Sequence, residues 1–294
     1  MTGIILQGIG GFYTVMDDET GERYQLRAQA KIRRERLTPL VGDRVEYEPA
    51  DREDVDGWLK SILPRKNALV RPSVANIDEI VVVCASSSPK ADTLLMDRLL
   101  ISAERAGMNS SIVVNKADLD ADEARALAEE YRFSGAKVFL TSAKTGEGVS
   151  EIKEHLMGKV HAFGGQSGVG KSSLINALYA LSLSTGSVSS RIERGKHTTR
   201  RCELIPVAGG GSVLDTPGFS LLETELMEPK ELQMFYPELR PFEGKCRFSP
   251  CFHAGEPDCL AKQALLRGEI PEKRYERYLE LLNEMKERWK NRYD

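Results

Sequence analysis

The sequence predicts an α/β protein made of three parts, and three observations support this prediction. Residues 1–68 alternate between apolar and polar side chains, which is typical of short strands with one buried face. Residues 73–222 alternate between apolar strand-like runs and amphipathic helices, which indicates a doubly wound α/β domain. Residues 223–294 carry clustered cysteines and then one charged helical stretch. We therefore expect a β-barrel, an α/β domain and a helical domain, in that order.

Length and composition limit the classes of protein to consider. A chain of 294 residues is long enough for two or three domains. No apolar run approaches the roughly 18 residues that a membrane span needs, and the first residues lack the pattern of a secretory signal. We expect a soluble cytoplasmic protein without a membrane partner. Because nothing indicates a dimerisation surface, we also expect a monomer.

The first part suits an OB-like or SH3-like barrel of about five strands. Strands are expected at 12–15, 24–28 and 43–47, separated by glycine-rich or acidic turns. Basic residues gather at 27–36 and 60–71. Since OB barrels bind nucleic acid on one side, these residues predict an RNA-binding face. The alternative is a solvated charged edge that keeps the sheet from pairing with other chains.

The second part should place ligands at the carboxyl ends of its strands, as doubly wound sheets do. Its strands are expected at 80–84, 111–114, 137–140, 160–163 and 212–214, and its helices at 92–106, 121–132, 148–157 and 171–178.

A phosphate-binding loop follows the strand at 160–163. Its residues are Gly165, Gln166, Ser167, Gly168, Val169, Gly170, Lys171, Ser172 and Ser173. The glycines let successive N–H groups point at a phosphate, and the helix that follows adds the positive end of its dipole. We expect Lys171 to bridge the β- and γ-phosphates and Ser172 to bind Mg²⁺.

Two further loops indicate that the nucleotide is a guanine nucleotide. The first consists of Asn115, Lys116, Ala117 and Asp118, and the second of Ser142, Ala143 and Lys144. The Asp118 carboxylate can accept hydrogen bonds from N1–H and the exocyclic amine of guanine, whereas adenine would oppose it with a lone pair. Asn115 would brace the neighbouring loops, and the Ala143 amide would contact the guanine O6.

Two later segments would sense the γ-phosphate. Asp215 follows an apolar strand and can hold Mg²⁺ through water, while the Gly218 amide faces the γ-phosphate. The hydroxyl-rich segment 195–200 would supply Thr198 or Thr199 to Mg²⁺, and we expect the Mg²⁺ ligands to be Ser172, Thr199 and Asp215. The alternative for 195–200 is an ordinary basic surface loop.

In this chain the base-binding loops precede the phosphate loop, the reverse of the order in Ras-like GTPases. The order Asn115–Asp118, Ser142–Lys144, Gly165–Ser173, 195–200 and 215–219 resembles the circularly permuted P-loop GTPases of the RsgA (YjeQ/YloQ) family, over essentially the whole chain. The resemblance implies an OB-fold barrel at 1–68, a circularly permuted GTPase domain at 73–222 and a zinc-binding helical domain at 223–294. It further implies binding to the small (30S) ribosomal subunit and its rRNA, with GTP hydrolysis there during late subunit maturation.

The predicted catalytic residue is His197. Phe219 occupies the position where Ras-like enzymes have a glutamine that orients water, so intrinsic hydrolysis should be slow. Imidazole can orient water or accept its proton at neutral pH. We hypothesise that docking on rRNA orders the basic loop and places His197. The alternatives are that His197 contacts RNA or caps the loop.

A zinc site is predicted in the third part. Its ligands would be Cys246, Cys251, His253 and Cys259, a set typical of a closed tetrahedral structural site with one Zn²⁺ per chain. The alternative is four unrelated residues. A charged helix is expected at about 271–292, with Tyr275, Leu282 and Met285 on its buried face. Its arginines, Arg274 and Arg277 among them, are expected on a solvated face, with a modest RNA contact as the alternative.

Three classes of function remain. The first is a GTPase that small ribosomal subunits stimulate. The second is an RNA-binding GTP/GDP switch in which hydrolysis is incidental. The third, a P-loop kinase or ATPase, conflicts with the guanine-selecting Asp118. The permutation joins the C-terminal part directly to the segment 215–219, so we hypothesise that the nucleotide state moves both appended domains.

Overall fold

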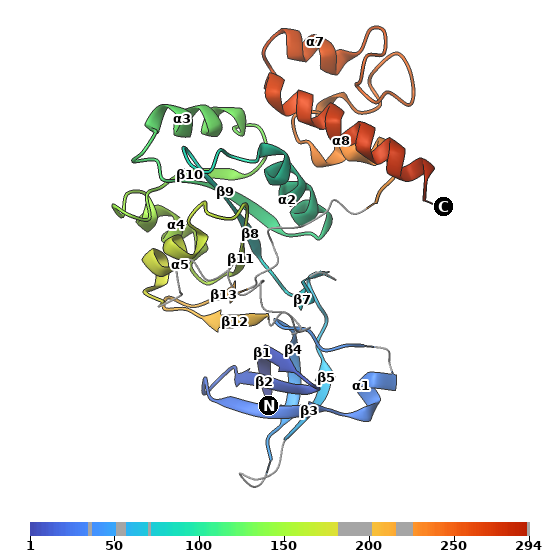
Figure 1. Ribbon diagram of the computed structural model, residues 1–294. Helices are drawn as coiled ribbons and strands as arrows, with labels where there is room; N and C mark the ends of the chain where they lie inside the picture. The colour runs from blue at the N-terminus through green and yellow to red at the C-terminus, as the bar shows by residue number, and fades with distance from the viewer. Residues whose placement is uncertain (35–36, 51–56, 70–71, 182–201, 216–225, 293–294) are drawn as a thin grey trace.

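Three parts follow one another along the molecule in the computed structural model, which describes residues 1–34, 37–50, 57–69, 72–181, 202–215 and 226–292. The N-terminal barrel lies at one end, the C-terminal helices lie at the other, and the α/β domain lies between them (Figure 1). In the ranges just given, no helix combines the length and apolar character that crossing a membrane requires. The predicted fold class, with its OB-like barrel, is confirmed.

The N-terminal part is a closed five-stranded barrel. Its strands are β1 (Thr2–Ile9), β2 (Phe12–Asp17), β3 (Arg23–Ala28), β4 (Arg44–Glu48) and β5 (Gly57–Ile62), with α1 (Ala30–Arg34) between β3 and β4. Their order is β1-β2-β3-β5-β4, and β4 pairs back onto β1. Side chains at alternate positions, such as Val15, Leu26 and Leu59, fill the interior. Their neighbours along each strand therefore point outward.

A parallel sheet with helices on both faces forms the α/β domain. The strands are β8 (Glu79–Ala85), β9 (Asn109–Asn115), β10 (Lys137–Leu140), β11 (Val160–Gly164) and β13 (Ser212–Asp215), in the order β10-β9-β8-β11-β13. The helices are α2 (Thr93–Arg105), α3 (Ala121–Glu130), α4 (Val149–Leu156) and α5 (Lys171–Tyr179). Every residue of β8 is buried. Its side chains alternate between a core beneath α2 and α3 and a core beneath α4 and α5, as expected of a doubly wound sheet.

The barrel is hydrogen-bonded to the edge of this sheet. Strand β12 (Glu203–Pro206) runs antiparallel to β13 and also pairs with β1, with Gln7 opposite Glu203. One continuous sheet of 11 strands therefore joins the barrel to the α/β domain. A short separate ribbon, β6 (Ala68–Leu69) with β7 (Val74–Ala75), follows the barrel along the chain.

The C-terminal part packs on α2. It consists of η2 (Pro229–Phe235), η3 (Arg240–Phe242), α7 (Leu260–Leu266) and the long α8 (Glu272–Lys290). Tyr278, Leu282 and Met285 of α8 join one apolar cluster with Ile101 of α2. The helix expected at 271–292 is thus present, with its predicted apolar face buried.

A buried ion cluster also joins α8 to the α/β domain, and it corrects the expectation that Arg274 and Arg277 lie on a solvated face. We name this set of side chains the Asp97 cluster; it comprises Asp97, Tyr131, Glu238, Arg274 and Arg277. Asp97 accepts hydrogen bonds from Arg274 at 2.5 Å, from Arg277 at 2.7 Å and from the Tyr131 hydroxyl at 2.8 Å. Arg274 also donates to Glu238 at 2.7 Å. Both arginines are buried because their partners lie inside the interface.

Candidate functional site

The predicted nucleotide loops lie at one edge of the parallel sheet. Asn115 ends β9, the loop 141–145 follows β10, and the phosphate loop follows β11. Because these strands are parallel, their carboxyl ends meet at the same edge. Segments that are separated by up to about 50 positions in sequence therefore come into direct contact.

Glycine is required at two positions of the phosphate loop. Gly165 has φ +132°, and a Cβ atom there would lie 2.1 Å from the Val83 carbonyl oxygen. Gly170 has φ +94°, and a Cβ atom there would lie 2.5 Å from Nδ2 of Asn115. These backbone angles and contacts exclude an ordinary side chain. The loop then enters α5 at Lys171, which puts the N–H groups of the first turn, including those of Ser172 and Ser173, at the end of the loop.

Lys171 lies over the phosphate loop. Its Nζ donates to the carbonyl oxygens of Gly165 at 2.6 Å and Gln166 at 2.7 Å. Burial without a countercharge lowers the pKa of Lys171 to about 8. A phosphate in the loop would supply that countercharge and raise the pKa of Lys171 again, which favours the protonated form. Lys171 is thus held where an anion would pair with it.

Asn115 connects all three loops. Its Nδ2 donates to the Val169 carbonyl at 2.9 Å, and its Oδ1 accepts from the Ala143 amide at 3.0 Å. The side chain is buried, so both bonds are shielded from water. One side chain therefore fixes the first base loop against the second and against the phosphate loop, as the sequence predicted for it.

Lys116 extends from the first base loop across the phosphate loop. Its Nζ donates to the Gly168 carbonyl at 2.8 Å and to the Ser88 carbonyl. The other two positions of this loop differ: Ala117 donates its amide to the Thr141 carbonyl at 3.0 Å, whereas Asp118 is exposed. The Asp118 carboxylate is therefore accessible to a ligand.

The second base loop is a tight turn. The Ser142 hydroxyl accepts from the Thr145 amide at 3.1 Å, and Ser142 itself is buried. Ala143 is half-buried and Lys144 is exposed. Ser142 thus shapes the turn, and Ala143 and Lys144 lie at the surface.

Sequence reasoning missed the segment after β8. The Ser86 hydroxyl donates to the Lys116 carbonyl at 2.7 Å, and Ser88 supplies the carbonyl that Lys116 contacts. Both residues support the first base loop without belonging to a recognised motif. Only their position in the sequence could have indicated them, because polar residues that follow a buried parallel strand lie at the edge of the sheet where ligands bind.

The remaining predicted nucleotide residues are only partly described. Asp215 ends β13, the strand next to β11, so its backbone lies at the same sheet edge. His197, Thr198, Thr199 and Gly218 lie outside the described residues.

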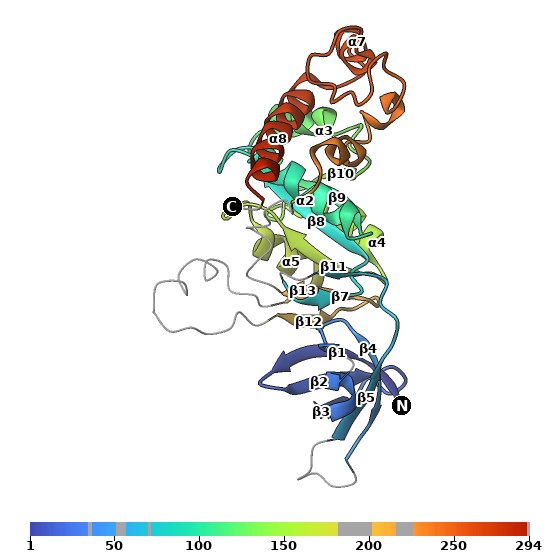
Figure 2. The same ribbon diagram turned by 90° about the vertical axis from the view of Figure 1, so that its right-hand side faces the viewer.

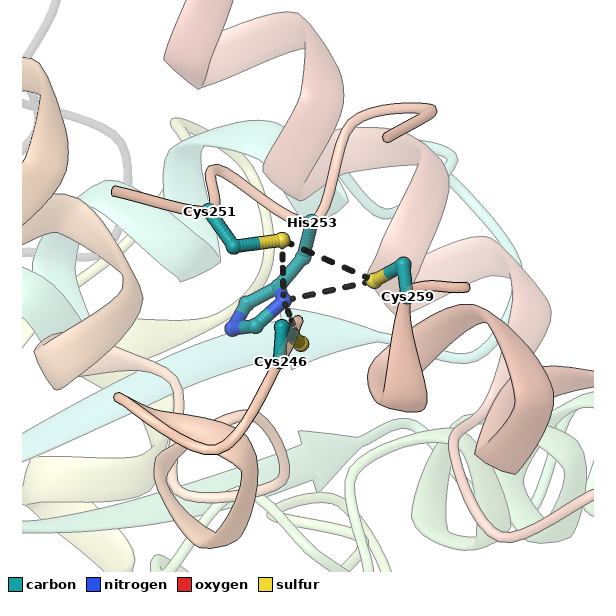
Figure 3. Close-up of side chains that lie close together, drawn as sticks. All are labelled: Cys246, Cys251, His253 and Cys259. Atoms are coloured by element: carbon teal, nitrogen blue, oxygen red, sulfur yellow. Dashed lines mark hydrogen bonds between the residues drawn. The ribbon is translucent and has the colours of Figure 1, made fainter. Parts of the chain in front are cut away.

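The four predicted metal ligands lie together in the C-terminal part. The three sulfur atoms surround Nδ1 of His253, at 3.7 Å for Cys246, 3.4 Å for Cys251 and 3.4 Å for Cys259 (Figure 3). All four potential ligand atoms lie within 4.8 Å of one another. A tetrahedral Zn²⁺ bound at about 2.0–2.3 Å separates its ligands by about 3.5–3.8 Å. The three distances to His253 come close to this spacing, and the donor set is that of a closed tetrahedral site that could hold a metal.

Two tyrosines of α8 support the ligand loop. Tyr275 donates its hydroxyl to the His253 carbonyl at 2.5 Å, and Tyr278 donates to the Phe252 carbonyl at 2.6 Å. Tyr275 and Tyr278 are both buried. Since α8 also carries Arg274 and Arg277, the helix connects the four potential metal ligands to the Asp97 cluster.

Comparison with known proteins identifies the family. A family model described as RsgA N-terminal domain matches residues 2–59, and one described as RsgA GTPase matches residues 62–225. A curated relative from Ruminiclostridium cellulolyticum, named small ribosomal subunit biogenesis GTPase RsgA, is 43% identical over 97% of this chain and 94% of its own.

Two solved structures also resemble this chain over nearly its full length. The crystal structure of YjeQ from Thermotoga maritima has a TM-score of 0.84 at 39% identity and covers 97% of this chain and 98% of its own. The structure of YloQ, described as a circularly permuted GTPase, has a TM-score of 0.80 at 37% identity, with 98% of this chain and 95% of its own covered. With both family models and these near full-length relatives in agreement, the chain belongs to the RsgA family of GTPases.

Proposed function

We propose that this GTPase binds the small (30S) ribosomal subunit and hydrolyses GTP in a subunit-stimulated manner during late subunit maturation, in the cytoplasm. The observation that supports the proposal most is the Asn115 side chain, which ties both base loops and the phosphate loop into one site. The curated relatives carry the name small ribosomal subunit biogenesis GTPase, which supports the choice of partner.

Within this proposal the nucleotide has a defined orientation. Asp118 and Ala143 bind the guanine edge, Lys116 covers the base, and Lys171 neutralises the phosphates. Because the Ala143 amide donates to Asn115 in the free protein, guanine binding requires that its N–H be shared with O6 or released from Asn115. Mg²⁺ accompanies GTP and is bound by Ser172, with Asp215 and a threonine of the segment 195–200 as further ligands. The accessible Asp118 and the preformed phosphate loop support this arrangement.

His197 supplies the catalytic step in this proposal by orienting the attacking water once rRNA has ordered its loop. The test is single-turnover GTP hydrolysis by His197→Ala, with and without small subunits. A loss confined to the stimulated rate is expected. Full stimulated turnover in the variant would remove His197 from the mechanism.

We further propose that the cluster of Cys246, Cys251, His253 and Cys259 holds one structural Zn²⁺. Its donor set and spacing support zinc, and a closed four-ligand site leaves no open position for catalysis. The ion would hold the loop that Tyr275 and Tyr278 support. Metal analysis of the purified chain should give one Zn²⁺ per chain, and none in Cys259→Ser.

The three parts have separate roles in this proposal: residues 1–68 contact RNA, residues 73–222 bind and hydrolyse GTP, and residues 223–294 hold the zinc. The chain acts as a monomer. Strand β12 pairs with β1 of the barrel and follows the segment that contains His197 in the chain. This pairing supports coupling between RNA binding at the barrel and GTP hydrolysis.

GTP turnover with purified small subunits, large subunits and free RNA in parallel tests this function. Stimulation by small subunits alone is expected. An unstimulated rate, together with nucleotide-dependent subunit binding, would favour the RNA-binding switch with incidental hydrolysis. Equal stimulation by all three additions would contradict the proposed partner.

A further inference from the structure

The central strand β8 ends between the first base loop and the phosphate loop. It lies between β9, which leads into the first base loop, and β11, which leads into the phosphate loop (Figure 2). The ladder between β8 and β9 ends at the pair of Ala85 and Asn115. Ser86 is the next residue along the chain, and it is only 4% exposed. This buried serine therefore lies beside the start of the first base loop.

Ser86 binds two successive carbonyl groups of that loop. Its N–H donates to the Asn115 carbonyl at 3.0 Å, and its hydroxyl donates to the Lys116 carbonyl at 2.7 Å. The hydroxyl thus continues the contact between the two chain segments beyond the last pair of the ladder. Lys116 has φ +62°, a left-handed conformation that is unfavourable for a residue with a side chain. The hydrogen bond from Ser86 stabilises the loop in that conformation.

The Lys116 carbonyl also closes the turn that presents Asp118. It accepts from the Leu119 N–H at 2.9 Å, while the N–H of the same peptide unit, that of Ala117, donates to the Thr141 carbonyl at 3.0 Å. Both edges of this peptide unit are therefore held, and the serine hydroxyl holds one of them. Asp118 follows in the turn and is exposed. The direction of its carboxylate therefore depends on the backbone of the turn.

We propose that Ser86 is a positioning residue that determines specificity: its hydroxyl holds the turn in the form in which Asp118 can accept both hydrogen bonds from guanine. The inference rests on the proposed guanine-nucleotide site and adds to it a residue from outside the three loops. Adenine makes no use of the Asp118 carboxylate, because its N1 is an acceptor. Loss of the Ser86 hydroxyl should therefore weaken the binding of guanine nucleotides alone.

Calorimetric titration of GDP and ADP into Ser86→Ala measures this effect. Without the hydroxyl the turn can adopt other conformations, and GDP must select the competent one. GDP affinity should fall by about twofold to about twelvefold, which corresponds to one hydrogen bond at about 0.5–1.5 kcal/mol. ADP affinity should not change. The ratio of the two affinities reports on the positioning of Asp118, whereas a general disturbance of the site would change both affinities.

Ser134→Ala is the matched control. Ser134 is also buried, and its hydroxyl donates to the Tyr131 carbonyl at 2.6 Å. It precedes β10 in the chain, so it lies near the amino ends of the strands, away from the nucleotide loops. Ser134→Ala should lower the midpoint of urea unfolding as Ser86→Ala does, but it should bind GDP like the parent.

A double-mutant cycle tests whether Ser86 acts through Asp118. In an Asp118→Ala background, Ser86→Ala should leave GDP affinity unchanged, because the carboxylate that it positions is already absent. Displacement of a fluorescent GDP analogue gives the affinities, since GDP binds weakly in this background.

Two results would overturn the role of Ser86. One is a ratio of GDP to ADP affinity in Ser86→Ala that equals the ratio in the parent. The other is the same loss of GDP affinity with and without the Asp118 carboxylate. Failure of the proposed site is distinct, because the unmodified chain would then bind GDP and ADP with equal affinity.

Discussion

Removing the Asp97 carboxylate should destabilise the contact between α8 and the α/β domain by about 3 kcal/mol. Asp97 has no exposed surface, and its two oxygens accept bonds from Arg274, Arg277 and Tyr131. Breaking a buried ion pair by deleting one partner costs about 3–5 kcal/mol, because the remaining charge stays buried. Glu238 and Glu130 still pair with the two arginines, which favours the lower end of that range.

Urea unfolding of Asp97→Ala measures this loss. Trp289 at the end of α8 reports on the interface in a Trp58→Phe background. With m-values of about 1–3 kcal/mol per molar urea, the midpoint should fall by at least about 1 M. The control is Glu269→Ala, which removes an exposed pair with Arg267 and should leave the midpoint unchanged. A loss below about 1 kcal/mol in Asp97→Ala would refute the reasoning.

Three further predictions follow from local geometry. Gly170→Ala should abolish GTP binding because its Cβ would meet the Asn115 amide nitrogen at 2.5 Å; Gly146→Ala, also at positive φ but with open space around it, should still bind GTP in the same titration. Hydrogen bonds from the Tyr47 hydroxyl and two backbone N–H groups lower the pKa of Asp17 to about 2. The stability that Asp17→Asn loses should therefore be constant above about pH 5 and disappear between about pH 4 and pH 2, as the carboxylate protonates in the folded state too. If the difference in unfolding free energy between the parent and Asp17→Asn grew toward low pH, the lowered pKa of Asp17 would be contradicted. Chelating the proposed Zn²⁺ should make the C-terminal part the first to be cut in limited proteolysis, whereas cleavage of the barrel first would contradict a structural role for that ion.

Local patterns in the sequence were enough to predict most elements of the α/β domain. The run 80–84 lies within β8, and the phosphate loop enters α5 at Lys171 as expected. Such elements depend on side chains that are close in sequence, so periodicity and motif spacing identify them. The same holds for the cluster of three cysteines and one histidine, whose four potential metal ligands span only 14 positions from Cys246 to Cys259.

Contacts between distant segments could not be predicted. Arg274 and Arg277 match the pattern of a solvated helix face, and only Asp97, more than 170 positions earlier, explains their burial. Likewise, no local pattern indicates that β12 pairs with β1. These contacts bear on the hypothesis that the nucleotide state moves both appended domains. The C-terminal part packs against α2, whereas the barrel is hydrogen-bonded to β12. Because β12 follows the segment containing His197 in the chain, the barrel is coupled to that segment more directly than the C-terminal part is.

Loops that are distant in sequence meet at one sheet edge, where we propose that they form one guanine-nucleotide site. Calorimetric titration of GDP and ADP into the unmodified chain and into Asp118→Ala tests it most directly. We expect GDP to bind at least about a thousandfold more tightly than ADP, and Asp118→Ala to remove most of that difference, because its carboxylate is the group that distinguishes the two bases. Equal affinity of the unmodified chain for GDP and ADP would contradict the claim.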